Sequence, residues 1–495
     1  GEYRISLRHF HLPKEDEGRY DSILNYYRSL YRDTDPYNCI VFVNSRIKAE
    51  RTSKSLRTFT QNAGSGKRVA IHHGSISSEI RKDSEAKLKS GDFKTTLVAT
   101  MTMELGIDVG DVERVVQLEP PHSSSSFVQR MGRSGRRTGC PVMIMYSTDD
   151  DTCPYDTPLG FSQNLVQALA LVKLYDVDHW VEPMQHSRLP YSLLFQQILI
   201  NVAVSGGIRA ESLIHSLLTM YPFREISEDD CRDMVTSMIE SDVLTVYAEE
   251  GTLLVGEAGE KLLGPRTILA MFQDDNDYPV VSKDKTIGYL PKRPKVGSKV
   301  LLGGQAWLVT GMKGHSVAVQ PIQSEAVTKW GSGIPDVHTK VVRTMRDILM
   351  GEDVDVEMDE ASRSRLDYDR EMLRDSGAGR GLFIRDGDDI VIYPWLGTVQ
   401  FDTLLRLIQR MDGVRIIDVV PMFKIRVLTA MSTTELYEAI ENSRTSVDPF
   451  DLFEKGDDLE SEKFDSYIPR HLLRKKFVKE RIDLVKGNHI HPVIQ

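Results

Sequence analysis

At 495 residues the chain is long enough for about three or four domains, and its 40% hydrophobic and 27% charged residues are typical of a soluble globular protein. It has no secretory signal, no apolar run of about 18 residues that would span a membrane, and four scattered cysteines without a C-x-x-C pair. This pattern argues against disulfides and a metal site and indicates a reducing cytoplasm. Because the net charge is −10, nucleic acid would have to be held by local basic features.

The first 150 residues alternate short β-branched runs with amphipathic runs of helical spacing. We predict strands at 38–44, 68–72, 95–100, 112–118 and 141–146, and serine-capped helices at 45–59, 77–90 and 125–131. This alternation predicts an α/β domain with a parallel sheet that helices cover on both faces. Such sheets bind their ligands at the carboxyl ends of the strands, where the polar motifs of this segment fall.

A glycine-spaced arginine cluster, Q-R-x-G-R-x-G-R, occupies residues 129–136 at the end of the last predicted helix. Arginine binds phosphate oxygens with two parallel hydrogen bonds and neutralises the charge that develops during phosphoryl transfer. The glycines let the backbone pass close to a ligand. An isolated arginine-rich loop is usually a solvated surface, but this spacing indicates a site that grips a polyphosphate.

Four segments in chain order resemble the second RecA-like domain of superfamily 2 helicases. They are Val41–Arg46 (motif IV), His72–Ser75 (the next strand-end loop), Ala99–Val109 (motif V) and Gln129–Arg136 (motif VI). The residues of these four segments most resemble those of the large helicase-related (Lhr) family. Lhr proteins often end motif VI in Gly-His, whereas this chain has Gly135-Arg136-Arg137, and from this departure we expect an Lhr-like side branch.

The resemblance implies a motor that binds ATP with Mg²⁺ between two RecA-like domains. Arg133 and Arg136 would reach the γ-phosphate as arginine fingers, and Gln129 would sense it. Arg130 would bridge to the acidic motif of the partner domain beside the nucleotide. We therefore expect the catalytic groups of this chain to come from motif VI.

Motif V and the strand ends would line the nucleotide and the nucleic acid. Gly106 would leave room for the nucleotide, and Asp108 would bind its ribose or motif VI. His72 could equally be a satisfied strand residue, and helix capping is an equal alternative for Thr102 and Glu104. The residues expected to contact phosphates along the nucleic-acid path are Ser45, Arg46, His73, Gly74 and Thr100.

A motor ATPase also needs a phosphate loop, G-x-x-x-x-G-K-[ST], and a carboxylate pair for magnesium and water. Gly64–Lys67 does not qualify, because Arg68 replaces the Ser/Thr and a strand follows; we interpret it as a turn. Asp359-Glu360 ends an acidic stretch, 351–360, that we expect to be a mobile loop. We therefore predict that the chain alone does not hydrolyse ATP, and that an absent first RecA-like domain, in cis or on a partner chain, holds most of the ATP.

Three amphipathic helices at 191–204, 210–220 and 227–241 and a hairpin at 243–247 and 252–255 predict a winged-helix domain. In transcription factors the third helix of this motif enters the major groove of DNA. Here that helix carries five acidic side chains against Arg232, so phosphates would repel it. We expect a structural or strand-guiding role.

The rest of the chain resembles the β-barrel-like fourth domain and the end of Lhr cores. Strands are expected at 287–290, 299–302, 306–310, 316–320 and 389–393, and a helix at 402–411. Trp307 is expected in the core, whereas Trp330 could stack on an unpaired base or simply pack. The basic stretch 470–479 should dock on the acidic stretch 448–465 or face solvent, with nucleic-acid contact as an alternative.

The expected architecture is an α/β RecA-like domain (1–155), a connector with a winged-helix domain (156–275) and an α+β, β-barrel-like region (276–495). Our main hypothesis is the carboxy-terminal part of an ATP-dependent helicase that acts on single-stranded or partly duplex DNA or RNA, with 3′ to 5′ polarity by resemblance. A chain that begins with Gly1 also suggests a fragment. The alternative is a non-enzymatic nucleic-acid-binding or regulatory subunit that completes an ATPase site in trans.

Overall fold

The computed structural model describes residues 3–13, 18–73, 78–90, 93–104, 110, 112–135, 139–150, 160–184, 188–247, 251–264, 266–269, 271, 278–282, 285–290, 294–302, 305–314, 316–322, 336–379 and 383–484. None of the helices in these ranges combines the length and apolarity that a bilayer crossing requires. The chain divides into two compact units. Unit 1 consists of Gly1–Met184, Pro335–Ser446 and Leu484–Gln495, and unit 2 of Gln185–Ile334 and Val447–Asp483. The chain therefore returns to unit 1 after residue 334, whereas the sequence suggested three consecutive domains.

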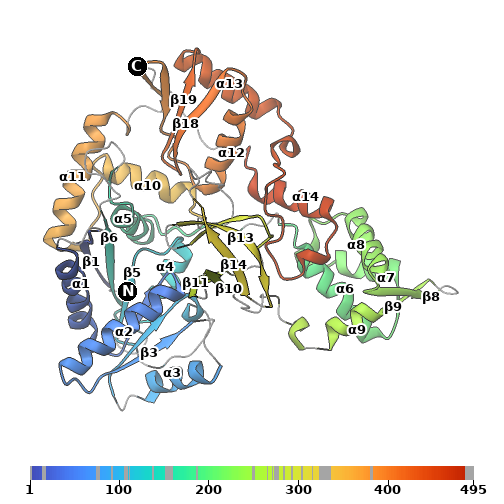
Figure 1. The fold of residues 1–495 in the computed structure, drawn as a ribbon, viewed down its shortest axis with the longest axis horizontal. Coiled ribbons are helices and arrows are strands. Elements are labelled where there is room, and N and C mark those ends of the chain that lie inside the picture. The colour runs from blue at the N-terminus through green and yellow to red at the C-terminus, as the bar shows by residue number, and fades with distance from the viewer. Residues whose placement is uncertain are drawn as a thin grey trace. The chain divides into compact units, whose positions relative to one another are not determined.

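Unit 1 is built on a seven-stranded parallel sheet with the order β15-β1-β6-β5-β2-β4-β3 (Figure 1). Its strands are β1 (Arg4–His11), β2 (Cys39–Val43), β3 (Arg68–His72), β4 (Thr95–Ala99), β5 (Arg114–Leu118), β6 (Val142–Asp149) and β15 (Glu357–Met358). The predicted parallel sheet and its five predicted strands are confirmed. The sequence analysis did not predict β1 or β15.

Helices cover both faces of this sheet, as the strand pattern predicted. Val41 and Val43 of β2 pack in a cluster with α1 and α2, whereas Ile40 and Phe42 face a cluster that includes α4, α5 and α10. The alternation follows from the two-residue period of a strand. The helices of this region are α1 (Arg19–Thr34), α2 (Arg46–Asn62), α3 (Ser78–Ser90), α4 (Ser124–Met131), α5 (Gln163–Asp176), α10 (Thr339–Leu349) and α11 (Glu360–Ser376), with a 3₁₀ turn η1 (Met101–Met103).

The acidic stretch 351–360 was predicted to be a mobile loop, and for its second half this prediction is wrong. Glu357 and Met358 form β15 and pair in parallel with Ser6 and Leu7 of β1. Asp359 then caps α11, because its Oδ1 accepts a hydrogen bond from the Ser362 N–H at 2.8 Å. A two-residue strand has no periodic signal of its own and forms only because a distant strand edge is available.

A buried ionic cluster fastens α11 to the carboxyl ends of β1 and β6. Asp149 accepts from His11 Nδ1 at 2.7 Å, and its other oxygen lies 3.2 Å from both His9 Nε2 and Arg365 Nη1. Burial alone would raise the pKa of Asp149, but these cationic and donor neighbours hold it below the ordinary value. Asp369, which pairs with Arg365 at 2.9 Å, has its pKa raised to about 6 by burial. The cluster makes residues 336–379 part of the RecA-like unit.

The Gly64–Lys67 segment is a turn between α2 and β3, as predicted. The Lys67 ammonium donates to the backbone carbonyls of Thr34, Asp35 and Tyr37, at 2.9 Å for Asp35. Burial lowers the pKa of Lys67. A cation at the carboxyl end of α1 stabilises the helix dipole, so this lysine has a structural role and does not bind phosphate.

The remainder of unit 1 is a four-stranded antiparallel sheet with the order β16-β17-β19-β18 and two helices. These elements are β16 (Phe383–Asp386), β17 (Asp389–Ile392), β18 (Val414–Val420), β19 (Lys424–Thr429), α12 (Thr398–Gln409) and α13 (Thr433–Ser446). The predicted strand at 389–393 is confirmed, and the helix predicted at 402–411 begins about one turn earlier, at Thr398.

Unit 2 contains the predicted helices and hairpin together with a five-stranded sheet. Its first part is α6 (Tyr191–Ser205), β7 (Ile208–Arg209), α7 (Ala210–Leu218), η2 (Tyr221–Phe223), α8 (Glu228–Glu240), β8 (Leu244–Tyr247), β9 (Thr252–Val255), α9 (Glu257–Leu263) and η3 (Arg266–Leu269). The second is β10 (Tyr278–Ser282), β11 (Lys285–Leu290), β12 (Lys299–Leu302), β13 (Gln305–Lys313) and β14 (Ser316–Pro321). Trp307 packs against the small core of that sheet, as predicted.

The basic stretch forms α14 (Arg470–Arg481) and docks inside unit 2, as expected. The buried Lys476 ammonium lies 3.1 Å from Glu462 and 3.4 Å from Asp465, both in the acidic stretch. Further pairs reach α8 and the loop before it: Lys475–Asp230 at 2.6 Å, His471–Asp233 at 3.0 Å and Lys479–Glu225 at 3.1 Å. The acidic face of α8 therefore has a partner within the protein, which explains its charge.

Candidate functional site

Parallel pairing brings the loops after β2, β3, β4 and β5 to one edge of the sheet. These loops begin with Asn44, His73, Thr100 and Glu119, and each contains or adjoins a residue predicted to bind nucleic acid or nucleotide. The arginine helix α4 follows the β5 loop and ends at Met131. The sheet topology therefore brings the loops after β2, β3, β4 and β5 and the helix α4 to one edge of the sheet, where the sequence predicted the site.

Arg130 lies at the centre of this edge and is only 4% exposed. Its Nε donates to Glu104 Oε1 at 2.7 Å, and its Nη1 donates to Gln117 Oε1 at 2.8 Å and to Asn44 Oδ1 at 3.1 Å. The guanidinium also lies 5.1 Å from the centre of the Phe42 ring. Burial lowers the pKa of Arg130, and the Glu104 carboxylate opposes that change. The structure thus supplies a carboxylate within this domain, where the sequence analysis expected one from the partner domain.

The contacts of Arg130 join segments that are distant in the sequence. Asn44 also donates from Nδ2 to the Pro120 carbonyl at 2.9 Å, and Ser126 Oγ donates to the second oxygen of Glu104 at 3.1 Å. The loops after β2, β4 and β5 are therefore bonded to each other and to α4. Because these polar atoms are buried, loss of one partner would leave the others without their hydrogen bonds.

The other motif VI residues differ in how far they reach solvent. Arg133 is buried at 6% exposure, and its Nη2 donates to the Glu104 carbonyl oxygen. Gln129 is exposed on α4. Arg136 lies outside the described residues, so the finger roles of Arg133 and Arg136 and the sensing role of Gln129 stay predictions.

Gly135 is expected to be intolerant of a side chain. Its φ is +75°, and a Cβ there would lie 2.4 Å from the Pro141 nitrogen, which is backbone and cannot move aside. We predict that Gly135→Ala lowers the free energy of unfolding by about 3 kcal/mol or more, because left-handed strain of about 1–3 kcal/mol and a backbone clash add. Gly139→Ala is the matched control, since its φ is +74° but nothing lies within 4 Å of its Cβ. Equal losses in urea unfolding for the two variants would contradict this account.

The residues predicted to face nucleic acid differ in exposure. Ser45 is exposed and caps α2, with its Oγ accepting from the Lys48 N–H at 3.2 Å. Thr100 is 8% exposed and His73 4% exposed. Several predicted site residues fall outside the part of the chain that the structure describes: Gly74, the side chain of Arg46, Gly106, Asp108 and Trp330. Of the described candidates, Ser45 is the best placed to meet a phosphate in this conformation.

The contacts of His72 and Glu104 bear on the alternatives that the sequence left open for them. His72 is buried between Thr102 Oγ1, 2.8 Å from Nδ1, and Glu85 Oε1, 3.0 Å from Nε2. It is thus a satisfied strand residue. Glu104 is the counter-ion of Arg130, a role that the sequence analysis missed together with those of Asn44 and Gln117. Asn44 directly follows β2, Gln117 lies next to the last residue of β5, and Glu104 follows the 3₁₀ turn after β4, so a position near a strand end is the signal that could have suggested them.

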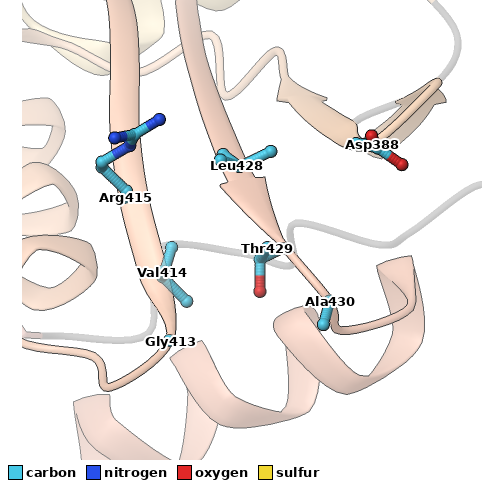
Figure 2. Close-up of a pocket in the computed structure, with 7 residues that line it drawn as sticks. All are labelled: Asp388, Gly413, Val414, Arg415, Leu428, Thr429 and Ala430. Atoms are coloured by element: carbon cyan, nitrogen blue, oxygen red, sulfur yellow. The ribbon is translucent and has the colours of Figure 1, made fainter.

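A surface pocket of about 640 Å³ lies elsewhere in unit 1, beside β18 and β19 (Figure 2). Gly413, Val414 and Arg415 line one side, and Leu428, Thr429 and Ala430 line another. None of the predicted site residues lines it. The candidate site is therefore the edge of the parallel sheet and not this pocket.

Residues 21–138 match the helicase conserved C-terminal domain. Together with the parallel sheet and the helix α4 at the carboxyl ends of its strands, this match defines the second RecA-like domain of a superfamily 2 helicase. The chain is of the Lhr type, and the part that the structure describes contains no first RecA-like domain.

ATP-dependent helicase Lhr-Core of Saccharolobus solfataricus is 26% identical over 341 residues, which cover 64% of this chain and 36% of that protein. Lhr-Core of Sulfolobus acidocaldarius is 30% identical over 196 residues, 39% of this chain and 20% of that protein. The structure of Mycobacterium smegmatis helicase Lhr bound to ssDNA and AMP-PNP has a TM-score of 0.57 at 16% identity, covering 98% of this chain and 67% of that one. At this identity the likeness shows the fold. The chain thus spans about a third or less of the length of these curated relatives.

Proposed function

We propose that this chain is the carboxy-terminal part of an ATP-dependent helicase that tracks along single-stranded or partly duplex nucleic acid. The observation that carries the proposal is the buried Arg130 network, which bonds the loops after β2, β4 and β5 to the arginine helix. The loops lie where nucleic acid would bind, and the helix together with the residues that follow it carries the groups that would meet ATP. Nucleic acid bound at the loops would therefore affect the position of the arginine groups beside ATP, and a motor requires such coupling.

On the nucleotide side, ATP with Mg²⁺ would be held mainly by a first RecA-like domain. Arg133 and Arg136 would extend from this domain to the γ-phosphate, and the exposed Gln129 would sense it. Arginine side chains stabilise the charge that builds up on the transferred phosphoryl group, so hydrolysis requires the two domains to close. Gly106 and Asp108 would line the remaining part of the nucleotide. Polarity is proposed as 3′ to 5′ by resemblance.

On the nucleic-acid side, hydroxyl groups and helix N-termini at the strand ends would hold phosphates without reading the base sequence. Ser45, at the exposed start of α2, is the clearest such group, with Arg46, His73, Gly74 and Thr100 beside it along the path. The winged-helix-like part of unit 2 would guide the strand, and Trp330 would stack on a base. The Mycobacterium smegmatis Lhr structure, which contains ssDNA, is consistent with this class of ligand.

A charge placed at Ser45 tests the nucleic-acid path. Aspartate is as good a helix cap as serine, so Ser45→Asp keeps α2 intact but repels phosphate. We expect affinity for a fluorescein-labelled dT20 oligonucleotide, measured by anisotropy at fixed salt, to fall about tenfold. Ser227→Asp is the control, because Ser227 caps α8 in the same way, with its Oγ accepting from the Asp230 N–H at 3.1 Å. Unchanged affinity for Ser45→Asp, or no binding by the parent chain, would overturn the proposed path.

A further inference from the structure

Glu182 lies in the connector that follows α5, two residues before the boundary between the units at Met184. Its carboxylate accepts two backbone hydrogen bonds from the start of the arginine helix, from Ser124 N–H at 2.7 Å and from Ser125 N–H at 2.9 Å. The two residues that it binds are the first two of α4. A side chain from a distant segment therefore holds the amino end of the helix that leads into the arginine cluster.

These bonds complete the cap of α4. The first N–H groups of a helix have no partner within the helix, and a negative charge at this end is favourable. Ser123 Oγ accepts from the Ser126 N–H at 3.1 Å, which leaves the Ser124 and Ser125 N–H groups for Glu182. Without Glu182 the helix would lose both bonds and the charge at once.

The connector is also fixed on its other side. The Trp180 N–H donates to the Leu174 carbonyl at 2.8 Å, and the Trp180 ring lies 5.0 Å from that of His338. The Lys340 ammonium pairs with Asp178 at 2.9 Å and lies 5.3 Å from the centre of the Trp180 ring. Residues 178–182 leave unit 1 for unit 2, and residues 338–340 follow the return to unit 1. The outgoing and returning segments are thus bonded together beside the arginine helix.

We propose that Glu182 is a positioning residue that ties the arginine helix α4 to the connector of unit 2. A displacement of the connector then moves the amino end of α4 and, through it, Arg130 and Arg133. The device rests on the proposed function, because it links unit 2, which would guide the strand, to the residues that would act on ATP. The geometry of the arginine fingers would then depend on the position of the connector that leads from unit 1 to unit 2.

Amide hydrogen exchange of this chain tests the structural half of the proposal. Loss of a cap opens the first turn, so Glu182→Ala should speed exchange at Ser124 and Ser125 about tenfold, with Glu182→Gln between it and the parent. Glu435→Ala is the matched control: Glu435 accepts from the Ser432 N–H at 2.7 Å before α13, so it removes the same kind of bond elsewhere in unit 1. Exchange at Ser124 and Ser125 that is equal in Glu182→Ala and the parent would overturn the proposal.

The functional half needs the protein that contains both RecA-like domains. With saturating dT20, Glu182→Ala should lower kcat for ATP about tenfold while KM for ATP changes less than about twofold, because positioning is lost and ground-state binding is not. Glu435→Ala should leave kcat as in the parent. A parent-like kcat for Glu182→Ala, or equal losses in the two variants, would contradict the coupling. If the parent two-domain protein does not hydrolyse ATP, the proposed function and the coupling both fail. Hydrogen exchange then still tests whether Glu182 caps α4.

Discussion

Replacing Arg130 by alanine is expected to lower the free energy of unfolding of unit 1 by about 3–5 kcal/mol, because it leaves a buried carboxylate without its cation. Glu104 is only 6% exposed, and both its oxygens point into the network. Gln117, which is fully buried, would lose its donor as well. Urea unfolding followed by circular dichroism measures the loss.

A surface arginine in the same unit provides the control. Arg426 pairs with Asp386 at 2.7 Å and with Asp389 at 3.0 Å, and its side chain is 33% exposed. Exposed pairs contribute about 0–1 kcal/mol, so Arg426→Ala should cost little. The double variant Arg130→Met with Glu104→Leu should be more stable than Arg130→Ala, since it removes both charges. If Arg130→Ala cost no more than Arg426→Ala, the network would not be the centre of the site.

In the protein with both RecA-like domains, Arg136→Ala is expected to reduce kcat for ATP hydrolysis by about 10³–10⁵-fold, the range for arginine fingers. Arg136→Lys should recover little of this, because an ammonium group cannot provide the planar fork. Arg133→Ala should also reduce kcat. Since the Arg133 guanidinium also bonds the Glu104 carbonyl, stability must be measured alongside for that variant. Steady-state ATPase assays with saturating dT20 give the values.

Arg137 offers a control of the same charge next to the motif. Arg137→Ala should change kcat by less than about threefold, because the resemblance assigns it no contact with phosphate. If Arg136→Ala and Arg137→Ala had the same effect, a general positive field and not a finger would account for the arginine cluster. If neither variant lost activity, motif VI would not act on ATP.

The sequence predicted the parts of the fold that depend on short-range periodicity. In β2 the alternation of Ile40 and Phe42 with Val41 and Val43 places side chains on both faces, and continuous apolar runs of this kind indicate a buried parallel strand. Ser45 caps α2, as expected for the serine-capped helix predicted at 45–59, whereas the cap of α4 is Ser123, two residues before the predicted start at 125. The motif loops therefore came out at the correct edge of the sheet.

The parts that were missed depend on contacts between distant segments. β1 carries an alternation of its own, since Ile5 and Leu7 are buried and Arg4 and Ser6 are less so, but no strand was predicted there. β15, by contrast, forms only on the edge of β1. The pairing of Arg130 with Glu104 spans 26 residues, and that of Glu182 with Ser124 spans 58. No local pattern distinguishes such a glutamate from a solvated one.

The fold gives the reason for the negative charge of the acidic helix α8. Its charge was interpreted as unfavourable for phosphate, which remains a sound physical argument. The structure adds that Asp230 and Asp233 pair with Lys475 and His471 of α14. The basic and acidic helices are thus complementary halves of one contact in unit 2.

The most direct test of the account is ATP hydrolysis by this chain alone and by the same chain joined to a first RecA-like domain, each with and without dT20. We predict no hydrolysis by the chain alone under any condition, and hydrolysis stimulated by dT20 when the two domains are joined. If the first domain, added as a separate chain, restored the same ATPase activity as the joined protein, the alternative of a subunit that completes an ATPase site in trans would be favoured. Hydrolysis of ATP by the 495-residue chain alone would contradict the account.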